Sequence, residues 1–289
     1  MNVLITGSSG FIGSNLLKIF MNTNYNVLAL YNQKKPKKKI SRNIKFLKFD
    51  LQKMSNFFII KKFKPDVVIH LAWKGIPNFS YRNSYLNLKL STRFLIKISK
   101  LKSFRKLIVA GSSFEKNITE DNKYFVWAKV ELKKNIKKIC KNKKIDFGWF
   151  RIFYVFGNGQ RKKSLIPYII NSFKNKKIPV IKNLNNTNDF VYIDDVTNIF
   201  FNAINKKLNG NSFDIGSGKL TPVWKICILI EKIIFQKNIY FQKILKNKKK
   251  INKQTPKASL NKLKKYFKLY NPMSINQSLN KMILENIKL

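Results

Sequence analysis

The sequence of 289 residues is poor in the side chains that build metal centres and disulfide frameworks. It contains two cysteines, Cys140 and Cys227, and one histidine, His70. Such a composition argues against a histidine-based metal cluster, and two cysteines without a pairing pattern suit a reducing compartment. We therefore expect no bound metal ion, and we expect the protein to be cytoplasmic.

The chain also lacks a hydrophobic run that is long enough to cross a bilayer. The longest apolar stretch near its C-terminus, residues 226–235, is interrupted by Glu231 and Lys232. A membrane-spanning helix needs about 20 predominantly apolar residues. The first strand pattern begins at Asn2, which leaves no room for a signal peptide before it. We expect neither a transmembrane segment nor a leader.

Acidic residues and arginine are scarce, whereas lysine is abundant. Only 13 residues are Asp or Glu against 59 that are Lys or Arg, so the formal net charge is +46, and six of the basic residues are arginines. A charge of this size points first to nucleic acid. However, arginine is the residue favoured for bidentate contacts with bases and phosphates. Because the lysines are spread along the whole chain, as A/T-rich coding would give, we expect no nucleic-acid partner.

A regular alternation of strand and helix patterns runs through the first half of the chain. It predicts an α/β fold with a doubly wound parallel sheet, whose ligands bind at the carboxyl ends of the strands. The strand patterns are residues 2–6, 25–31, 44–49, 66–71, 106–110 and 147–153, and the helical patterns are residues 11–21, 54–63, 84–101 and 124–140.

Three glycines follow the first strand with the spacing G-x-x-G-x-x-G. Gly7 permits a tight turn, Gly10 permits close approach of the backbone to a pyrophosphate, and Gly13 permits close packing of the helix on the sheet. The helix start at Phe11 and Ile12 offers backbone N–H groups and a positive dipole end to phosphate. The motif therefore predicts a dinucleotide site at the beginning of the chain.

This glycine motif resembles that of the extended short-chain dehydrogenase/reductase superfamily, which includes the NAD-dependent epimerase/dehydratase family of nucleotide-sugar enzymes. Further segments resemble the family in order along nearly the whole chain. The resemblance implies a Rossmann-type dinucleotide-binding domain over residues 1–160. It also implies a smaller C-terminal substrate lobe, mainly residues 161–289, from which roughly residues 188–216 return to the Rossmann core.

The resemblance also assigns cofactor contacts beyond the glycine motif. Asp50 and Leu51 follow the third strand, where an acidic residue of relatives contacts the adenine. Leu71 and Ala72 follow the fourth strand and match the segment that lines the cofactor groove. Asn87, on the next helix, stands where the family has an asparagine.

The end of the second strand bears on the choice between NAD and NADP. NAD enzymes commonly carry an acidic residue there that bonds the ribose hydroxyls, but this sequence has Tyr31 and Asn32. Lys34, Lys35 and Arg42 lie nearby and favour a 2′-phosphate. We expect NAD or NADP as the cofactor and lean toward NADP.

The catalytic residues of the family are Ser or Thr, Tyr and Lys, with the Tyr as acid/base. Ser112 matches the Ser or Thr position and Lys129 matches the Lys position. The resemblance also makes Lys129 a cofactor-binding residue. The position four before Lys129 is Phe125, and Tyr124 lies one residue earlier, which rotates it by about 100° on a helix. Three interpretations remain. A local irregularity lets Tyr124 serve, Glu115 or a water held by Ser112 and Lys129 moves the proton, or the protein binds the cofactor and carries out slow or no redox chemistry.

The segments on the substrate side resemble those of nucleotide-sugar enzymes with some departures. Family 4,6-dehydratases carry Asp-Glu after the Thr, and Ser113 followed by Phe114 argues against that reaction. The resemblance makes Ser112, Ser113, Arg151, Tyr154 and Gln160 substrate-binding residues.

These observations predict an NAD(P)-dependent epimerase or keto-reductase that acts on a nucleotide-activated sugar in polysaccharide biosynthesis. The resemblance implies a homodimer. The alternative is a catalytically impaired cofactor-binding or scaffolding protein of the same fold, including one that binds RNA.

Overall fold

A computed structural model describes residues 1–33, 41–237 and 255–285 of the chain. The chain forms two compact units, and each is described by itself. The first consists of Met1–Ile152 and Thr197–Phe213, and the second of Phe153–Val196 and Asp214–Leu289. By this division the first segment runs to Ile152 and the returning segment is Thr197–Phe213. The domain bounds expected from the sequence, residues 1–160 with roughly residues 188–216 returning, stay a prediction.

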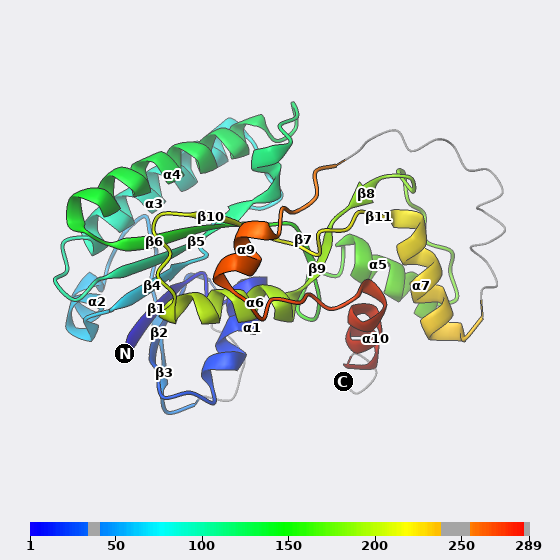
Figure 1. The fold of residues 1–289 in the computed structure, drawn as a ribbon, viewed down its shortest axis with the longest axis horizontal. Helices are drawn as coiled ribbons and strands as arrows, with labels where there is room; N and C mark the ends of the chain where they lie inside the picture. The colour runs from blue at the N-terminus through cyan, green and yellow to red at the C-terminus, as the bar shows by residue number, and fades with distance from the viewer. Residues whose placement is uncertain (34–40, 238–254, 286–289) are drawn as a thin grey trace. The chain divides into compact units, whose positions relative to one another are not determined.

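The first unit contains the glycine motif and the alternating strands and helices (Figure 1). Its elements are β1 (Asn2–Thr6), α1 (Phe11–Phe20), β2 (Asn26–Tyr31), β3 (Ile44–Lys48), α2 (Phe57–Phe63), β4 (Val67–His70), α3 (Tyr81–Ile98), β5 (Lys106–Ser112), a short 3₁₀ helix (Ser113–Lys116), α4 (Lys123–Lys143) and β6 (Asp146–Ile152). The returning segment adds the end of α6 (Ile193–Asn202), a second 3₁₀ helix (Ala203–Asn205) and the start of β10 (Ser212–Ile215).

The strands form one seven-stranded sheet with the order β10-β6-β5-β4-β1-β2-β3. β1 pairs in parallel with both β2 and β4, and the β2–β3, β4–β5 and β5–β6 pairs are parallel as well. The strand order therefore reverses between β1 and β4, where such sheets bind their ligands. The predicted doubly wound parallel α/β fold is confirmed.

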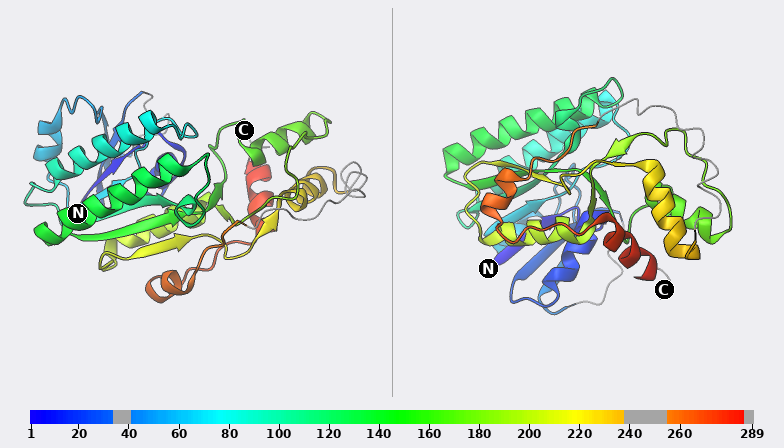
Figure 2. Two further views of the ribbon diagram at one scale, coloured as in Figure 1. Left: turned by 90° about the horizontal axis from the view of Figure 1, so that it is seen from above. Right: turned by 45° about the vertical axis from the view of Figure 1, so that its right-hand side comes forward.

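Alternate residues of the strands pack on opposite faces of this sheet, as a two-residue period requires. Leu4 and Val68 belong to one buried cluster with residues of α2, α3 and α4, including Phe94 and Leu132. Fully burying such a side chain stabilises the fold by about 1.5–3 kcal/mol. The opposite face is covered by α1, and Phe20 at its end packs edge-on against Phe201 of the returning segment. Figure 2 shows the helices on both faces.

Two helices begin three residues away from the positions that the sequence pattern indicates. α2 begins at Phe57, because Met54 and Asn56 before it adopt left-handed backbone angles, with φ of 53° and 65°. α3 begins three residues earlier than expected, at Tyr81, because the hydroxyl of Ser80 accepts a hydrogen bond from the backbone N–H of Asn83 and caps the helix. Apolar periodicity alone does not locate these ends.

The second unit is built from short strands and four helices in the part of the chain that is described. β7 pairs in parallel with β9, and β8 pairs with β11 in antiparallel orientation. The elements are β7 (Tyr154–Phe156), α5 (Leu165–Lys174), β8 (Thr187–Asn188), β9 (Phe190–Tyr192), β11 (Thr221–Pro222), α7 (Val223–Phe235), α9 (Asn261–Tyr266) and α10 (Ile275–Glu285), together with the start of α6.

One buried carboxylate holds three segments of the second unit together. Asp189 is 2% exposed and accepts hydrogen bonds from the backbone N–H groups of Ser217, Gly218 and Ala258 and from the Ser217 hydroxyl, at 2.6–3.0 Å. Hydrogen bonds to charged groups contribute about 1.5–3 kcal/mol each.

Within the described ranges, no helix has the length and apolarity that crossing a membrane requires.

Candidate cofactor and catalytic site

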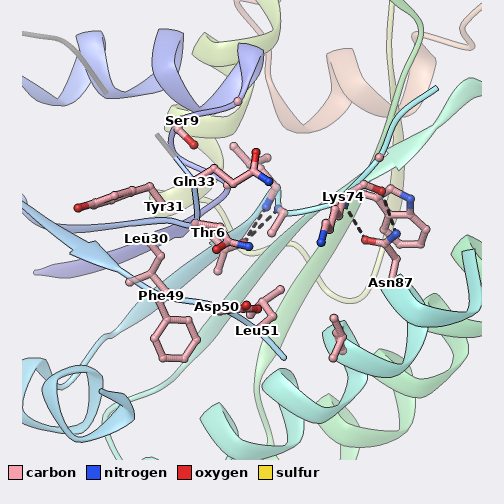
Figure 3. A pocket seen from close by; sticks show the side chains of 18 residues that line it. Thr6, Ser9, Leu30, Tyr31, Gln33, Phe49, Asp50, Leu51, Lys74 and Asn87 are labelled. Carbon is pink, nitrogen blue, oxygen red and sulfur yellow. Dashed lines mark hydrogen bonds between the residues drawn. The ribbon is translucent and has the colours of Figure 1, made fainter. Parts of the chain in front are cut away.

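A cavity of about 320 Å³ opens at the carboxyl ends of β1, β2, β3 and β4 in the first unit. Figure 3 shows its labelled side chains, from Tyr31 and Phe49 on one side to Lys74 and Asn87 on the other. The cavity lies at the reversal of the strand order, which is where doubly wound sheets bind their ligands. Seven of the residues predicted to bind the cofactor line it, namely Gly7, Gly10, Asp50, Leu51, Leu71, Ala72 and Asn87.

The glycine turn leaves no space for side chains at two of its three glycines. Gly7 has a φ of 70°, and a Cβ there would lie 2.9 Å from the backbone nitrogen of Ala72. A Cβ on Gly13 would lie 2.3 Å from the carbonyl oxygen of Gly7, so the helix packs directly on the turn. Gly10 caps α1 without any side-chain hydrogen bond.

The start of α1 suits a phosphate group. Phe11, Ile12 and Gly13 form its first turn, where backbone N–H groups have no carbonyl partner within the helix, and the helix dipole favours an anion. Gly10 and Ser9 line the cavity next to this turn. The residues of this side of the cavity therefore fit the diphosphate of a dinucleotide.

A buried hydrogen-bond chain fixes the backbone that follows β4. Thr6 Oγ1 accepts bonds from the N–H groups of Leu71 and Ala72, both at 3.2 Å, so its own hydrogen points to His70 Nδ1 at 2.9 Å. His70 Nε2 then donates to Ser91 Oγ at 3.1 Å. Burial, with a smaller effect of the charge on Lys129, lowers the pKa of His70 to about 3. The imidazole is therefore neutral and structural.

The rim of the cavity at the end of β2 carries no carboxylate. Tyr31, Asn32 and Gln33 line the cavity there. Asp50 follows β3 and accepts a bond from the N–H of Gln52 at 2.8 Å. Lys34 and Lys35, which we expected to favour a 2′-phosphate, lie outside the described residues. A neutral rim of this kind does not repel a 2′-phosphate.

Asn87 fastens the loop after β4 to helix α3. Its Oδ1 accepts from the N–H of Lys74 at 2.7 Å, and its Nδ2 donates to the carbonyl oxygens of Lys74 and Asn83 at 3.0 and 2.8 Å. The amide therefore uses both of its ends inside the protein, while its side chain still borders the cavity (Figure 3). This arrangement positions the loop residues, including Trp73, at the edge of the cavity.

Lys129 is buried in an aromatic environment beside the cavity and does not line it. The side chain is 6% exposed, and its Nζ donates to the carbonyl oxygen of Ala110 at 2.9 Å. Nζ also lies 3.9 Å from the ring centre of Trp73 and 6.0 Å from that of Trp149. Burial lowers the pKa of this amine to about 8, against the opposing effect of the charge on Glu115. An amine with such a pKa exchanges protons near neutral pH.

Phe125 occupies the helix face of Lys129, and Tyr124 points elsewhere. Phe125 is 4% exposed, and its ring centre lies 5.8 Å from Lys129 Nζ and 5.5 Å from the ring centre of Trp73. Tyr124 is 41% exposed and packs edge-on against Tyr81 at 5.5 Å. The helix is regular from Lys123 onward, so the irregularity that would bring Tyr124 to Lys129 is absent from α4.

Ser112 ends β5, and its hydroxyl accepts a bond from the N–H of Phe114 at 3.3 Å. Ser113 begins the 3₁₀ helix that follows. Glu115 folds back so that its Oε1 accepts from the N–H of Ser112 at 2.8 Å and from Trp149 Nε1 at 2.9 Å. The carboxylate is therefore fixed close to Ser112.

Sequence reasoning gave no functional weight to Trp73 and Trp149, which surround Lys129. The available signal was a large aromatic side chain directly after Leu71 and Ala72, in the loop that follows β4. Nothing in the sequence connects Trp149 to Glu115, because 34 residues separate them.

The substrate-binding residues expected from the sequence fall into both units. Arg151 lies in β6 of the first unit, level with Gly111 of β5. In the second unit, Tyr154 packs against Phe190 at 4.7 Å, and burial raises its pKa. Gln160 follows a glycine turn, and its Nε2 donates to the carbonyl oxygen of Val155 at 3.4 Å. Across the described part of the chain, no group of three or more His, Cys, Asp or Glu side chains gathers as metal ligands do.

The chain is similar to known proteins in sequence and in fold. The sequence model of the NAD dependent epimerase/dehydratase family matches residues 3–216. CDP-abequose synthase of Salmonella muenchen is 25% identical over 241 residues, 80% of each chain. GDP-6-deoxy-D-talose 4-dehydrogenase of Aggregatibacter actinomycetemcomitans is also 25% identical, over 81% of this chain and 80% of the relative.

Solved structures share the fold over the whole chain. The Bordetella bronchiseptica enzyme WbmF in complex with NADH superimposes with a TM-score of 0.84 at 19% identity, covering 99% of this chain and 92% of that one. UDP-glucuronic acid 4-epimerase from Bacillus cereus, in complex with UDP-glucuronic acid and NAD, has a TM-score of 0.80 at 21% identity, covering 100% and 99%.

Proposed function

Because this chain belongs to the NAD dependent epimerase/dehydratase family, we propose that it is an NAD(P)-dependent enzyme of nucleotide-activated sugars that works as an epimerase or keto-reductase. The observation that carries the proposal is the cavity at the reversal of the strand order, with the glycine turn and the start of α1 on its border. The named relatives act on CDP- and GDP-linked sugars, which supports a nucleoside-diphosphate sugar as the substrate class.

The bound nicotinamide would exchange a hydride with a carbon of the sugar. Ser112 would hydrogen-bond the reacting sugar oxygen, and Lys129 would supply a positive charge near it. Since Phe125 has no hydroxyl and Tyr124 packs on Tyr81, we assign the acid/base role, the transfer of the proton, to Glu115 or to water beside Ser112. Arg151, Tyr154 and Gln160 are our candidates for sugar-nucleotide contacts.

For the cofactor we propose NADP in preference to NAD, because the rim at the end of β2 carries no carboxylate. Calorimetric titration with both oxidised and both reduced forms tests this choice. Moderate salt is needed in the buffer, since the charge of +46 otherwise attracts any anion. Binding of NAD but not NADP would refute the preference.

Turnover is tested with a panel of UDP-, GDP-, CDP- and dTDP-linked sugars, with the nicotinamide absorbance and product chromatography as readouts. Ser112→Ala should reduce turnover, whereas Ser99→Ala, at the end of α3, should not. A protein that binds no form of the cofactor at millimolar concentration would overturn the enzyme proposal. Light scattering tests the homodimer that we also propose.

A second candidate is a cofactor-binding protein of this fold without efficient turnover. It is favoured by Phe125, which places a buried phenyl ring on the helix face of Lys129. Cofactor binding without conversion of any sugar nucleotide in the panel would support it. RNA binding, tested by titration with single-stranded RNA at the same salt concentration, would extend it.

A further inference from the structure

Trp73 stands between the cavity and Lys129. The indole belongs to the lining of the cavity, and its ring centre lies 3.9 Å from the ammonium nitrogen of Lys129. Lys129, Phe125 and Ser112 do not line the cavity. A ligand in the cavity therefore meets Trp73 before it can approach the amine.

The backbone on both sides of Trp73 is held firmly. Ala72, before it, donates to Thr6 Oγ1 and lies against the glycine turn, with its nitrogen 2.9 Å from the position of a Cβ on Gly7. Lys74, after it, exchanges two hydrogen bonds with the amide of Asn87 at 2.7 and 3.0 Å. A displacement of Trp73 from Lys129 therefore requires rotation of its side chain and not movement of the loop.

The indole also has an unused donor. Trp73 Nε1 is buried and has no hydrogen-bond partner among the described residues. A buried N–H without an acceptor is costly, and an oxygen of the nicotinamide-side ribose, which adenosine diphosphate lacks, would supply one. By contrast, the indole of Trp149 already donates to Glu115. Of these two rings around Lys129, Trp73 is the one that gains a partner when it turns toward a ligand.

We propose that Trp73 is the specificity-determining residue of the cavity. With its ring over Lys129, the cavity accepts the adenosine diphosphate portion of a ligand. The rest of a dinucleotide reaches Lys129 only after the indole has rotated away. This inference rests on the proposed function, because it takes the cavity to be the cofactor site.

The dinucleotide is discriminated against because it competes with the indole ring for the space at the ammonium group of Lys129. Cation–π contacts of desolvated ammonium groups are the stronger ones, so the closed position of the ring is favoured. A ligand that needs the ring in its open position binds with an apparent affinity equal to its intrinsic affinity multiplied by the fraction of protein that is open. Adenosine diphosphate alone does not reach Lys129 and escapes this reduction.

The test compares adenosine diphosphate with the oxidised dinucleotide, NAD or NADP, whichever binds, by calorimetry at moderate salt. In Trp73→Ala we expect the affinity for the dinucleotide to rise about tenfold, while the affinity for adenosine diphosphate changes less than about twofold. Trp127→Ala is the matched control, because Trp127 is 38% exposed and stacks on Tyr81 away from the cavity. It should change neither affinity.

A second variant keeps the proposal testable if the alanine variant does not fold. Trp73→Phe retains an aromatic face but removes the indole N–H, and we expect an intermediate rise of about threefold for the dinucleotide. Intrinsic fluorescence gives an independent readout. Wild type should change its emission with dinucleotide but not with adenosine diphosphate, and Trp73→Phe should lose that difference.

The outcomes separate this inference from the proposed function. An unchanged ratio of the two affinities in Trp73→Ala and Trp73→Phe, with both ligands still bound, overturns the role of Trp73 alone. A fall in dinucleotide affinity overturns it too, since Trp73 would then be a stacking surface for the ligand. Failure of the wild type to bind either ligand overturns both proposals.

Discussion

Replacing Lys129 by methionine should change how the free energy of unfolding depends on pH. In the folded protein burial lowers the pKa of Lys129 from 10.5 to about 8. The unfolded chain therefore binds a proton to this amine at pH values where the folded protein does not. Stability is reduced most below about pH 8, and the reduction disappears as the pH rises toward 10.5.

The size of the effect follows from the two pKa values. With a pKa of about 8 in the folded state and 10.5 in the unfolded state, the reduction at pH 7 is about 3 kcal/mol. It falls to about 1 kcal/mol near pH 9.5, so this amine contributes a gain of about 2 kcal/mol between the two pH values. The cation–π contact with Trp73 and the bond to Ala110 shift the absolute stability of the variant. They do not change this dependence on pH.

The assay is urea denaturation of wild type and Lys129→Met at pH values between about 7 and about 9.5. The difference in unfolding free energy, wild type minus variant, should rise by about 2 kcal/mol over that interval. Other groups that titrate there are common to both proteins and cancel. Lys137→Met, an exposed position on the same helix, is the control and should give a constant difference. A constant difference for Lys129→Met as well would refute the account of a desolvated ammonium group.

Four further predictions concern the glycine turn, the catalytic side and the buried histidine. Gly7→Ala should destabilise the protein by about 2 kcal/mol or more in urea denaturation, because its φ is 70° and the new Cβ would meet Ala72; an unchanged midpoint would contradict this. Gly10→Ala, at a φ of −74°, should keep the fold but weaken dinucleotide binding by about tenfold or more in calorimetry, and equal affinity would remove the glycine turn from the site. Phe125→Tyr restores a hydroxyl on the face of Lys129 and should raise kcat by about tenfold or more on whichever sugar nucleotide is converted; no gain would show that the proton is handled elsewhere. His70, the one histidine of the sequence, should give one set of imidazole NMR signals that does not shift between about pH 8 and about pH 5. Because its folded pKa is lowered to about 3 from 6.5, its stabilising effect is complete above about pH 6.5 and about 2 kcal/mol smaller at pH 5.

The fold could be predicted from the sequence because local signals recur at a spacing that only one architecture satisfies. Buried-strand patterns alternate with helical ones, and the turn at Gly7 and Gly10 lies between the first strand and the first helix. Helix ends were less predictable. The left-handed residues Met54 and Asn56 delay α2, and such backbone angles have no reliable signature outside glycine.

The catalytic region was predictable only as far as helix geometry reaches. A spacing of four residues places Phe125 on the face of Lys129, and the structure has Phe125 buried and Tyr124 exposed. The contact of Trp73 with Lys129 joins residues from different elements, so no local pattern contains it. Long-range packing of this kind depends on the shapes of several elements together.

The cavity has a further consequence for the order in which the protein is made. Every residue that lines it lies between Thr6 and Leu90 of the 289-residue chain. Ribosomes add about 5–20 residues per second, so the complete lining is synthesised about 2–8 seconds before Lys129. The nucleotide site is thus encoded ahead of Lys129 and of the whole second unit. The residues that line this site are therefore synthesised before Ser112, Glu115 and Lys129, the residues proposed for catalysis.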